Sequence, residues 1–354
     1  MAKKVTIQQI ADYLGVSKYV VSKALSGKRG VSADTRKKVI EAASQLGYFA
    51  QKTNKAPSIQ LQETKLPVKK GEKEIVLVLM TNVRFQTRES TYWGAIVDGI
   101  SEALEKIKLG MVLLTENNVE SLIKVLNLEG FIGVITVGLV ESSLLVEVHK
   151  MGLPLVMIDY EDPLIPCDMI FNNNFDSSFQ LANHLIGLGH KHIQFVGDIH
   201  YSRSFYDRWS GLRSSIEENG IKAVFDPDLI SIDFFDLEKQ FSDWLGKCSK
   251  EDLPTAFVCA NDVIAVGVIS ILKKNGIHVP NDVSVTGFDN KEITFNMKPT
   301  VSTVHVEKEN LGKRAVEVLL RRMREQDAPF EKILMSGSLI LRESTAPPRD
   351  KKNQ

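Results

Sequence analysis

From Ile75 onward, the sequence alternates short, continuous apolar runs with segments long enough to form helices. Continuous runs are typical of strands buried on both faces, and strands separated by helices form parallel sheets with right-handed crossovers. An open sheet rarely exceeds about ten strands, so the number of runs predicts two lobes. The expected strands are Ile75–Met80, Met111–Thr115, Ile132–Val137, Leu155–Ile158, Met169–Phe171, Ile193–Val196, Leu229–Ile232, Ala256–Cys259, Val283–Thr286, Val301–Val304 and Leu334–Leu341.

Five longer segments are expected to be helices that cover these sheets. At about 100–200 residues per domain, the 354 residues predict two or three packed units. The composition, with 43% hydrophobic and 25% charged residues, is globular and excludes a collagen, a wholly disordered chain and a cysteine scaffold. The expected helices are Trp93–Ile107, Phe175–Gly187, Trp209–Asn219, Val263–Asn275 and Lys308–Arg324.

The cysteines and the apolar runs predict a cytoplasmic location. Cys167, Cys248 and Cys259 are widely spaced and form no C-x-x-C pair, which favours reduced thiols. The longest apolar runs reach six residues and polar sequence follows Met1 directly, so we expect neither a signal peptide nor a membrane span. The seven histidines show no metal-ligand spacing, and we expect no metal and no cofactor.

Positive charge is concentrated at the N-terminus, although the formal net charge of the chain is zero. Residues 1–56 hold 11 Lys and Arg against three Asp and Glu, a net charge of +8, and the remainder carries −8. A basic segment attached to an acidic body favours an added module that binds polyanions. A solvated basic tail is the alternative, but such a tail would lack the apolar periodicity of this segment.

The basic segment is expected to form three short helices. A T-x-x-Q capping box at Thr6 starts the first helix. Ser17 and Ser32 can cap the second and third helices, which extend to about Leu25 and Leu46. Two helices joined by a short turn and closed by a third are the helix-turn-helix arrangement, whose second helix enters the major groove of DNA.

The residues of this module resemble the headpiece of the LacI/GalR family of bacterial repressors. The resemblance covers about fifty residues, chiefly Val5–Ala11, Gly15–Ser17, Val21–Gly27, Val31–Arg36 and Leu46–Tyr48. A helical module with a chance basic face is the alternative. The resemblance implies a double-stranded DNA operator as partner, contacted by Thr6, Ser17, Lys18, Tyr19, Ser22, Lys23, Lys28, Arg29, Thr35 and Arg36.

These residues are expected to divide into two roles. Lys18 and Tyr19 stand at the positions that usually choose the operator in this family. Lys23 stands where relatives usually have Arg, and its ammonium lacks the fixed fork of a guanidinium, so we expect softer discrimination of guanine. The hydroxyl groups and the other cations are expected to contact phosphates, which position the module without reading sequence.

After Tyr48 the sequence departs from the family pattern. Relatives usually continue with a short hinge helix whose Leu wedges into the minor groove, but Pro57 takes the place of that Leu. Proline removes a donor and disfavours helical backbone at the preceding residue. We therefore expect an extended or disordered linker over residues 50–73. The alternative is that Pro57 itself acts as the wedge.

The rest of the chain resembles the sensor domain of the same family, on Leu153–Asp159, His184–Ile193, Pro254–Asp262, Val279–Asp289 and Leu341–Thr345. The resemblance implies a two-lobed α/β domain with parallel sheets, similar to periplasmic sugar-binding proteins. The implied boundaries are 1–49 for the headpiece, 74–345 for the effector-binding and dimerisation domain and 346–354 for a disordered tail. The chain would cross between the lobes near Phe171–Asn174, Asn290–Thr300 and Lys332–Met335.

In such sheets a ligand lies beyond the carboxyl ends of the strands, in the crevice between the lobes. Sugars need carboxylates, amides and guanidinium groups as partners, together with an aromatic wall. This chemistry and the resemblance predict a small, sugar-like effector held by Asn82, Trp93, Asp159, Asn173, Ser202, Ser204, Arg208, Phe234, Asn261 and Asp289.

Three residues of this region have a second interpretation. Asp289 could be a turn residue, and Asp262 could cap the helix that follows it. Arg208 could pair with Asp207 or Glu238 on the surface. These alternatives stay open at the level of the sequence.

The loop from Arg84 to Trp93 departs from the family pattern. Tyr92 and Trp93 could stack on a ring, and Arg84 or Arg88 could recognise an acidic or phosphorylated ligand. Both arginines could equally be solvated loop charges. The sequence therefore leaves the effector unnamed.

The leading interpretation is a DNA-binding repressor, not an enzyme, that forms a homodimer on a pseudo-palindromic operator. Its pairing surface is expected on the helix Trp93–Ile107 and the segment Val119–Leu128. A solute-binding protein for transport would share the sensor fold but should carry a signal peptide and no basic headpiece. An α/β enzyme is the third class, but the chain has no G-x-S-x-G motif, no Walker loop and no Cys/His pair at catalytic spacing.

Overall fold

The computed structural model describes residues 6–25, 32, 35, 38–39, 42, 75–81, 86–88, 90–116, 130–249 and 251–349. The chain divides into two units, residues 1–65 and 66–354. Several sequence predictions lie outside the described residues: the linker over residues 50–73 with Pro57, the segment Val119–Leu128, and the side chains of Lys28, Arg29, Arg36, Asn82 and Arg84.

In the first unit, α1 (Ile7–Leu14) and α2 (Lys18–Leu25) meet at a tight turn. Gly15 in this turn has φ of 63°, a left-handed conformation that glycine adopts without steric cost. Residues 35, 38, 39 and 42 are also helical. Ile10, Val21 and Val39 are fully buried against one another. The predicted helix-turn-helix headpiece is confirmed.

The serine caps of this unit form as predicted. The backbone N–H of Val20 donates to Ser17 Oγ at 3.3 Å, and that of Thr35 donates to Ser32 Oγ at 3.0 Å. Each cap satisfies a backbone donor that has no partner within its own helix.

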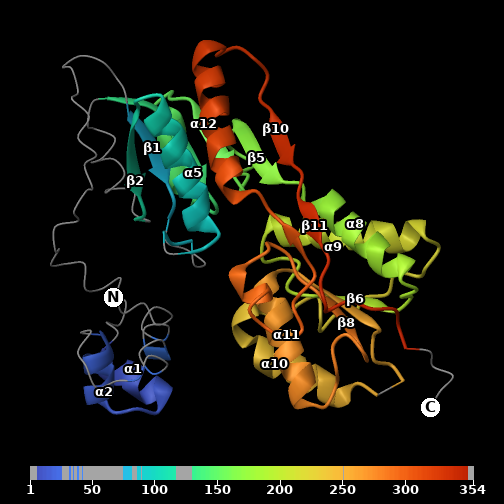
Figure 1. Ribbon diagram of the computed structural model, residues 1–354. Helices are drawn as coiled ribbons and strands as arrows, with labels where there is room; N and C mark the ends of the chain where they lie inside the picture. Colours follow the sequence, from blue (N-terminus) through green and yellow to red (C-terminus); the bar gives the residue numbers. More distant parts are fainter. Residues whose placement is uncertain are drawn as a thin grey trace. The chain divides into compact units, whose positions relative to one another are not determined.

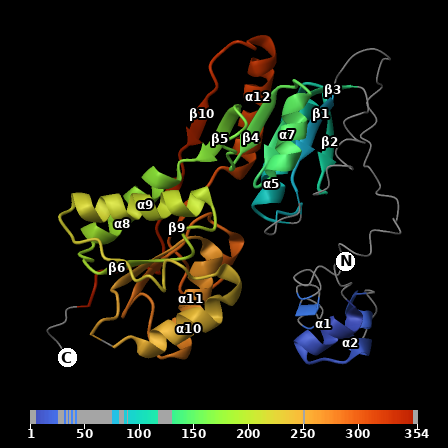
Figure 2. The same cartoon turned by 180° about the vertical axis from the view of Figure 1, so that it is seen from behind.

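The second unit contains two lobes, and the first lobe is built on a parallel sheet (Figure 1). Its elements are β1 (Ile75–Leu79), β2 (Gly110–Leu114), β3 (Phe131–Val137), β4 (Leu155–Ile158), β5 (Asp168–Asn172), β10 (Lys332–Met335), α5 (Trp93–Lys106), α7 (Ser142–Lys150) and α12 (Lys308–Arg324). The described strands follow the order β10-β5-β4-β3-β1-β2, and all neighbours are parallel. Helices α5 and α12 cover one face, and α7 covers the other (Figure 2).

The second lobe contains a parallel sheet of order β6-β7-β8 and an antiparallel pair, β11-β9. Its elements are β6 (Ile193–Val196), β7 (Ala256–Cys259), β8 (Ser284–Thr286), β9 (Thr303–His305), β11 (Ser338–Ile340), α8 (Asn174–Gly187), α9 (Arg203–Glu218), η1 (Phe234–Asp236), α10 (Leu237–Lys247), α11 (Asp262–Lys274) and η2 (Glu292–Thr294). These two lobes confirm the predicted α/β architecture with parallel sheets.

The chain crosses between the lobes after β5, after β9 and after β10. The first crossing lies within the predicted Phe171–Asn174. The second prediction, Asn290–Thr300, is wrong, because a backbone bridge between Asp289 and His305 keeps this segment in the second lobe. The third prediction, Lys332–Met335, covers β10 itself, and the crossing follows that strand.

The predicted strand Leu334–Leu341 is divided between β10 of the first lobe and β11 of the second, and two further elements differ from their predictions. Leu229–Ile232 is a turn, not a strand. The side chains at its two ends are buried. Its backbone carbonyls accept hydrogen bonds from the loop after β6, including one from the Gly197 N–H to the Leu229 carbonyl at 3.0 Å. Helix α9 begins six residues before the predicted Trp209, because Ser202 caps it.

The start of the expected disordered tail is attached to the second lobe. The backbone N–H of Ala346 donates to Ser284 Oγ at 3.1 Å, and the Ala346 carbonyl lies 2.9 Å from His190 Nε2. Arg349 forms an ion pair with Asp282. Residues 346–349 are therefore part of the folded lobe. Among the described residues, no helix has the length and apolar character needed to cross a bilayer.

Candidate functional site

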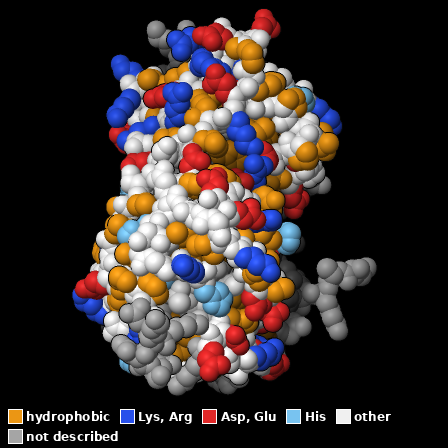
Figure 3. All heavy atoms as spheres, turned by 90° about the vertical axis from the view of Figure 1, so that its right-hand side faces the viewer, with side chains coloured by type: hydrophobic (Ala, Val, Ile, Leu, Met, Phe, Trp, Pro, Cys, Tyr) orange, Lys and Arg blue, Asp and Glu red, His pale blue; other side chains and the backbone are white. Residues whose placement is uncertain are grey.

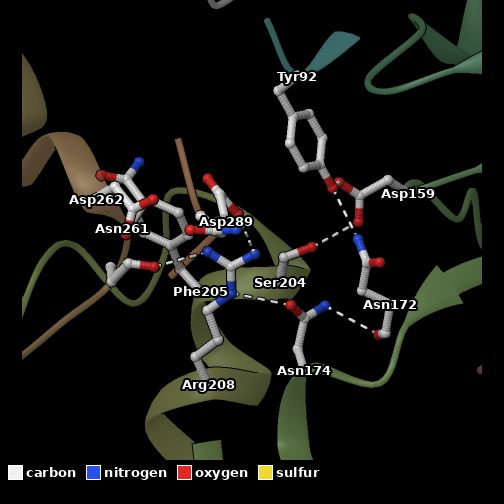
Figure 4. Close-up of polar contacts among 12 residues, drawn as sticks. Tyr92, Asp159, Asn172, Asn174, Ser204, Phe205, Arg208, Asn261, Asp262 and Asp289 are labelled. Atoms are coloured by element: carbon white, nitrogen blue, oxygen red, sulfur yellow. Dashed lines mark hydrogen bonds and ion pairs between the residues drawn. The ribbon is translucent and has the colours of Figure 1, made fainter. Parts of the chain in front are cut away.

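Polar side chains from both lobes converge at the carboxyl ends of the strands (Figure 4). Asp159 follows β4 of the first lobe and accepts two hydrogen bonds. The hydroxyl of Tyr92 donates to its Oδ2 at 3.0 Å, and Ser204, in the first turn of α9, donates to its Oδ1 at 2.7 Å. Because Ser204 belongs to the second lobe, one carboxylate joins the two lobes.

The first-lobe part of this site continues along β5. The side-chain amide of Asn172 donates to the Tyr92 hydroxyl at 2.8 Å. Burial raises the pKa of Tyr92 well above its usual value, and the charge of Asp159 raises it further. Burial also raises the pKa of Asp159, and this effect outweighs the hydrogen bonds that oppose it. Tyr92 therefore stays a neutral donor to Asp159.

Arg208 of α9 is the buried centre of the second-lobe part and is 4% exposed. Its Nε donates to Asn174 Oδ1 at 2.9 Å, and its two terminal nitrogens donate to the Ala260 carbonyl at 2.6 Å and to Asp289 Oδ1 at 3.3 Å. The guanidinium carbon lies 3.7 Å from the centroid of the Phe288 ring. Arg208 thus pairs with Asp289 inside the protein, which excludes the surface pairing with Asp207 or Glu238.

The loop after β8 presents Asp289 in a left-handed conformation with φ of 107°, and the next residue, Asn290, has φ of 51°. Such backbone persists only where surrounding contacts hold it. Lys308 Nζ, at the start of α12, donates to the Asp289 carbonyl at 2.6 Å. Arg342 donates to Asn290 Oδ1 at 2.6 Å. Lys308 and Arg342 each follow a crossing between the lobes. The loop that contains Asp289 and Asn290 is therefore hydrogen-bonded to the segments that connect the two lobes.

Asp262 lies behind this loop and is fully buried. It accepts from Thr303 Oγ1 and from the backbone N–H of Lys291, both at 2.6 Å. Burial, followed by the charge of Asp289, raises the pKa of Asp262 to about 7. Asn261, not Asp262, caps α11 by accepting from Ile264 N–H at 3.0 Å.

The headpiece presents a polar face on α2. Tyr19 is 69% exposed, and Lys18 and Ser22 are exposed, whereas Val21 is buried on the opposite side. Lys23 Nζ lies 5.2 Å from the centroid of the Tyr19 ring. Of the other predicted DNA contacts, Thr6 and Ser17 are exposed and Thr35 is partly buried. The outward side chains of α2 can donate hydrogen bonds to an acceptor-rich surface.

On the face of the second unit drawn in Figure 3, positive and negative side chains are mixed. There, Lys and Arg side chains are interspersed with Asp and Glu side chains and with apolar atoms. The described residues also contain no group of three or more His, Cys, Asp and Glu side chains arranged to hold a metal ion.

Two family models match this chain. The model for bacterial regulatory proteins of the lacI family matches residues 6–51, and the model for a periplasmic binding protein-like domain matches residues 182–345. The chain belongs to the LacI family. Its members are DNA-binding transcriptional regulators with an effector-binding domain, and not enzymes.

Similar proteins span nearly the whole of this LacI-family chain. The HTH-type transcriptional repressor PurR of Pasteurella multocida is 29% identical, over 96% of this chain and 98% of the relative. The PurR repressor of Histophilus somni is 28% identical with the same coverage. A solved complex of the transcriptional regulator CelR with cellobiose has a TM-score of 0.67 at 21% identity, covering 96% of this chain and 99% of that one. The Lac repressor dimer bound to operator and the anti-inducer ONPF has a TM-score of 0.63 at 23% identity, covering 97% and 100%.

The ten residues predicted for the LacI-family effector site have different positions. Asp159, Ser204, Arg208 and Asp289 join the network described above. Trp93 is half-buried at the start of α5, with its ring edge-on to Tyr92 at 4.8 Å. Asn82 and the side chain of Phe234 lie outside the described residues.

Three predicted residues are helix caps instead. Asn173 accepts from Asp176 N–H at 3.3 Å to cap α8, and Ser202 accepts from Phe205 N–H at 3.2 Å to cap α9. Asn261 caps α11, as described above. Their side-chain oxygens satisfy backbone donors of their own helices, so these residues do not join the hydrogen-bond network.

Sequence reasoning missed Asn172 and Asn174 as members of the network and left Tyr92 out of the predicted site. Strand alternation does not relate the two asparagines, because Asn172 ends β5 and Asn174 begins α8. No sequence signal marked Asp262 as a buried partner of Thr303.

The loop before α5 is fixed to the first lobe. Arg88 donates to the Gly94 carbonyl at 2.9 Å and pairs with Asp98 on the exposed side of α5. Gln86 is 3% exposed, and it donates to the Leu139 carbonyl at 2.8 Å and accepts from the Leu139 N–H at 2.6 Å. Arg88 is thus bound to the surface of its own lobe, which favours the interpretation as a loop charge.

Proposed function

We propose that this LacI-family regulator is a sequence-specific repressor whose operator affinity is controlled by a small, hydroxyl-rich, sugar-like effector between its two sensor lobes. The observation that carries the proposal is the hydrogen bond from Ser204 to Asp159, which makes one polar cluster out of two lobes. A ligand that offers its own hydroxyls to Asp159 competes with this contact. Ligand binding then changes the balance between lobe arrangements, as control of a second site requires.

The chemistry of the cluster supports a sugar-like ligand. Carboxylate oxygens of Asp159 and Asp289 can accept from ring hydroxyls, and the half-buried ring of Trp93 offers an apolar face. Two solved relatives, which share the fold at 21% and 22% identity, are a CelR complex with cellobiose and an Enterococcus faecium regulator with bound ribose. The sugars bound by these two relatives support the ligand class without naming the effector of this chain.

The effector proposal is tested by a melting screen of the full chain. A panel of mono- and disaccharides is added one at a time, and the unfolding midpoint is measured. A ligand at 100-fold its dissociation constant adds about 2.7 kcal/mol to the free energy of unfolding. Arg208→Met serves as the control because the buried guanidinium belongs to the site. A panel in which no sugar raises the midpoint contradicts the proposed ligand class.

For DNA, we propose that α2 enters the major groove and that Thr6, Ser17, Lys18, Tyr19, Ser22, Lys23, Lys28, Arg29, Thr35 and Arg36 contact the operator. The exposed polar face of α2 supports this assignment. Operators selected from a random duplex pool supply the probe. Lys23→Ala should cost about 1–3 kcal/mol and relax preference at one base pair, whereas Arg36→Ala should weaken all sequences equally and reduce the salt slope by about one. Equal, sequence-independent losses for both variants contradict the assignment.

We also propose a homodimer on a twofold operator, acting in the cytoplasm where the chromosome is accessible. The apolar side of α5 packs against α12, and its outer face carries Asp98, Glu102 and Glu105. A pairing surface on α5 would therefore be largely polar. Sedimentation of the full chain as a monomer at micromolar concentration contradicts the dimer.

The proposed domain boundaries are 1–49, 50–73 and 74–349, the last including the residues that Ala346 and Arg349 attach to the second lobe, with a linker that lacks the usual hinge helix. Headpieces on such a linker are tethered without strict geometry, so we expect weak bending of the operator and a modest effector response. Pro57→Leu restores the family residue and should increase both the bending of the operator and the response to the effector. If the wild type bends its operator sharply and Pro57→Leu reduces the bend, proline is itself the wedge.

A further inference from the structure

The two carboxylates of the effector cleft differ in their cationic partners. Asp289 lies next to the guanidinium of Arg208, at 3.3 Å, and its backbone carbonyl accepts from Lys308 Nζ at 2.6 Å. Asp159 accepts only from the hydroxyls of Tyr92 and Ser204 among the described residues. Positive charge is thus concentrated on the second-lobe side of the cleft, and the first-lobe carboxylate has none in contact (Figure 4).

Burial raises the pKa of Asp159 and the charge of Arg208 lowers it in part, but the guanidinium donates its hydrogen bonds to other acceptors. Three cations on neighbouring elements are also paired elsewhere. Arg203, one residue before Ser204, pairs with Glu161 and Asp207 on the surface. Lys332 also pairs with Glu161. Arg88 pairs with Asp98 on the outer side of α5. Any of these three side chains would have to break an existing ion pair before it could serve Asp159 as a cation.

Asp159 is also more open to a ligand than Asp162 and Asp262, two other carboxyls of the described residues without a cation in contact. These two are 3% and 0% exposed. Asp159 lies among groups from both lobes but keeps partial solvent exposure. A carboxylate of this kind favours a positively charged partner, because burial disfavours its charged form unless an opposite charge lies nearby.

Arg208 is a poor receptor for an anionic group. Its three nitrogens already donate to Asn174, Ala260 and Asp289, and one face of the guanidinium lies on the Phe288 ring. An anionic ligand would compete with Asp289 for Arg208 and approach Asp159, which repels it. The cleft therefore disfavours phosphorylated and acidic sugars on charge alone.

We propose that the effector carries a protonated amine, as a hexosamine does, and that this ammonium binds Asp159. The proposal rests on the proposed function and refines the ligand class of the same cleft. The ammonium donates to the free lone pairs of Asp159, and the sugar hydroxyls meet Asp289 and Arg208. Both an ammonium and a hydroxyl can donate to the carboxylate, but only the ammonium adds attraction between opposite charges, so exchange of the amine for a hydroxyl is expected to weaken binding about tenfold.

The test is calorimetric titration of the full chain with matched sets of sugars. Glucosamine, galactosamine and mannosamine are each compared with the parent hexose, the N-acetyl form and the hexose 6-phosphate. The expected result is that at least one hexosamine binds about tenfold more tightly than its parent hexose and its N-acetyl form. The matching hexose 6-phosphate should not bind. If a parent hexose or a hexose 6-phosphate binds as tightly as the matching hexosamine, this inference is overturned, but the proposed function is not.

Two variants locate the effect. Asp159→Asn keeps the shape of the side chain and removes its charge, so the preference for the amine over the parent hexose should disappear. Asp207→Asn, on the outer side of α9, should keep the preference. The wild-type titrations decide the proposal even if Asp159→Asn does not fold. If no sugar of any set binds, the proposed function fails and this inference fails with it.

Discussion

The two lobes contribute to the cleft in different ways. The second lobe holds its polar residues with buried charges, because Arg208 and Asp289 form an ion pair and Asp262 anchors the following loop through Lys291 N–H. Lys308, where the chain enters the first-lobe helix α12, adds a hydrogen bond to the Asp289 carbonyl. The first lobe offers Tyr92 and Asp159, which contact the rest of the site through hydroxyl hydrogen bonds alone.

This difference indicates which lobe is fixed in advance. Buried charge networks have few alternative arrangements because any unpaired member is costly, whereas a single hydroxyl bond can be exchanged for a ligand at little cost. We infer that the second lobe holds a preformed half-site and that the first lobe closes on it. The family model for the periplasmic binding protein-like domain matches residues 182–345, which contain the preformed half but not Tyr92 or Asp159.

The largest expected effect comes from Arg208→Met. The variant leaves Asp289, Asn174 and the Ala260 carbonyl without their buried donor, so the second lobe should lose about 3–5 kcal/mol of stability. Urea unfolding of the full chain measures the loss. Arg203→Met is the matched control on the same helix, and its exposed ion pairs should be worth less than about 1 kcal/mol. Similar losses for the two variants would remove the basis for a preformed second lobe.

The next effect is a pH dependence at Asp262. Its pKa of about 7 in the folded protein exceeds its usual value, so the folded state binds more protons than the unfolded state between these two values. Stability from this group is therefore greatest at low pH and is lost as the pH rises towards 7. Relative to Asp262→Asn, which cannot titrate, the wild type should lose about 2 kcal/mol between about pH 5 and pH 8.

Parallel unfolding curves for the wild type and Asp262→Asn across that pH range would contradict the pH prediction.

Lys308→Met tests the link between the crossing segment and the Asp289 loop. Hydrogen bonds to charged groups contribute about 1.5–3 kcal/mol, and this one holds a left-handed residue in place. We expect a lower melting midpoint and weaker effector binding. Lys313→Met, one turn along α12, removes only the surface ion pair with Glu102 and should change little. Equal shifts for the two lysines would show that the Asp289 loop holds its conformation without Lys308.

The smallest effect is expected at the contact between the lobes. Ser204→Ala removes one hydroxyl donor to Asp159 and should cost about 0.5–1.5 kcal/mol of stability. Small-angle scattering should show a larger population of open lobes in the variant. Ser210→Ala, further along α9, provides the control. A loss as large as that of Arg208→Met would mean that the first lobe is held as firmly as the second.

The sequence by itself determined the class of the fold and the headpiece. Continuous apolar runs such as Ile75–Met80 require burial on both faces, which in a chain with intervening helices leaves few arrangements besides parallel sheets. The charge difference between residues 1–56 and the remainder, together with the turn at Gly15, marked a separate basic module. The resemblance to the family also pointed to Arg208 and Asp289.

Only the tertiary structure decided which polar residues meet. Asn173, Ser202 and Asn261 follow strands or precede helices as ligand residues do, but capping and binding use the same side chains at the same positions. Local sequence cannot distinguish these roles, because the direction of a side chain depends on the strand or helix to which it belongs.

The second crossing between the lobes was misplaced for the same reason. Asn290–Thr300 is polar and irregular, as a connection should be, and no local feature of it records the bridge between Asp289 and His305. The contact of Lys308 with the Asp289 carbonyl likewise joins residues on either side of a crossing. Pairings of this kind arise from the packing of whole lobes. That packing brings the carboxylate of Asp159, which has no cation in contact, into one cleft with the buried charges of Arg208 and Lys308.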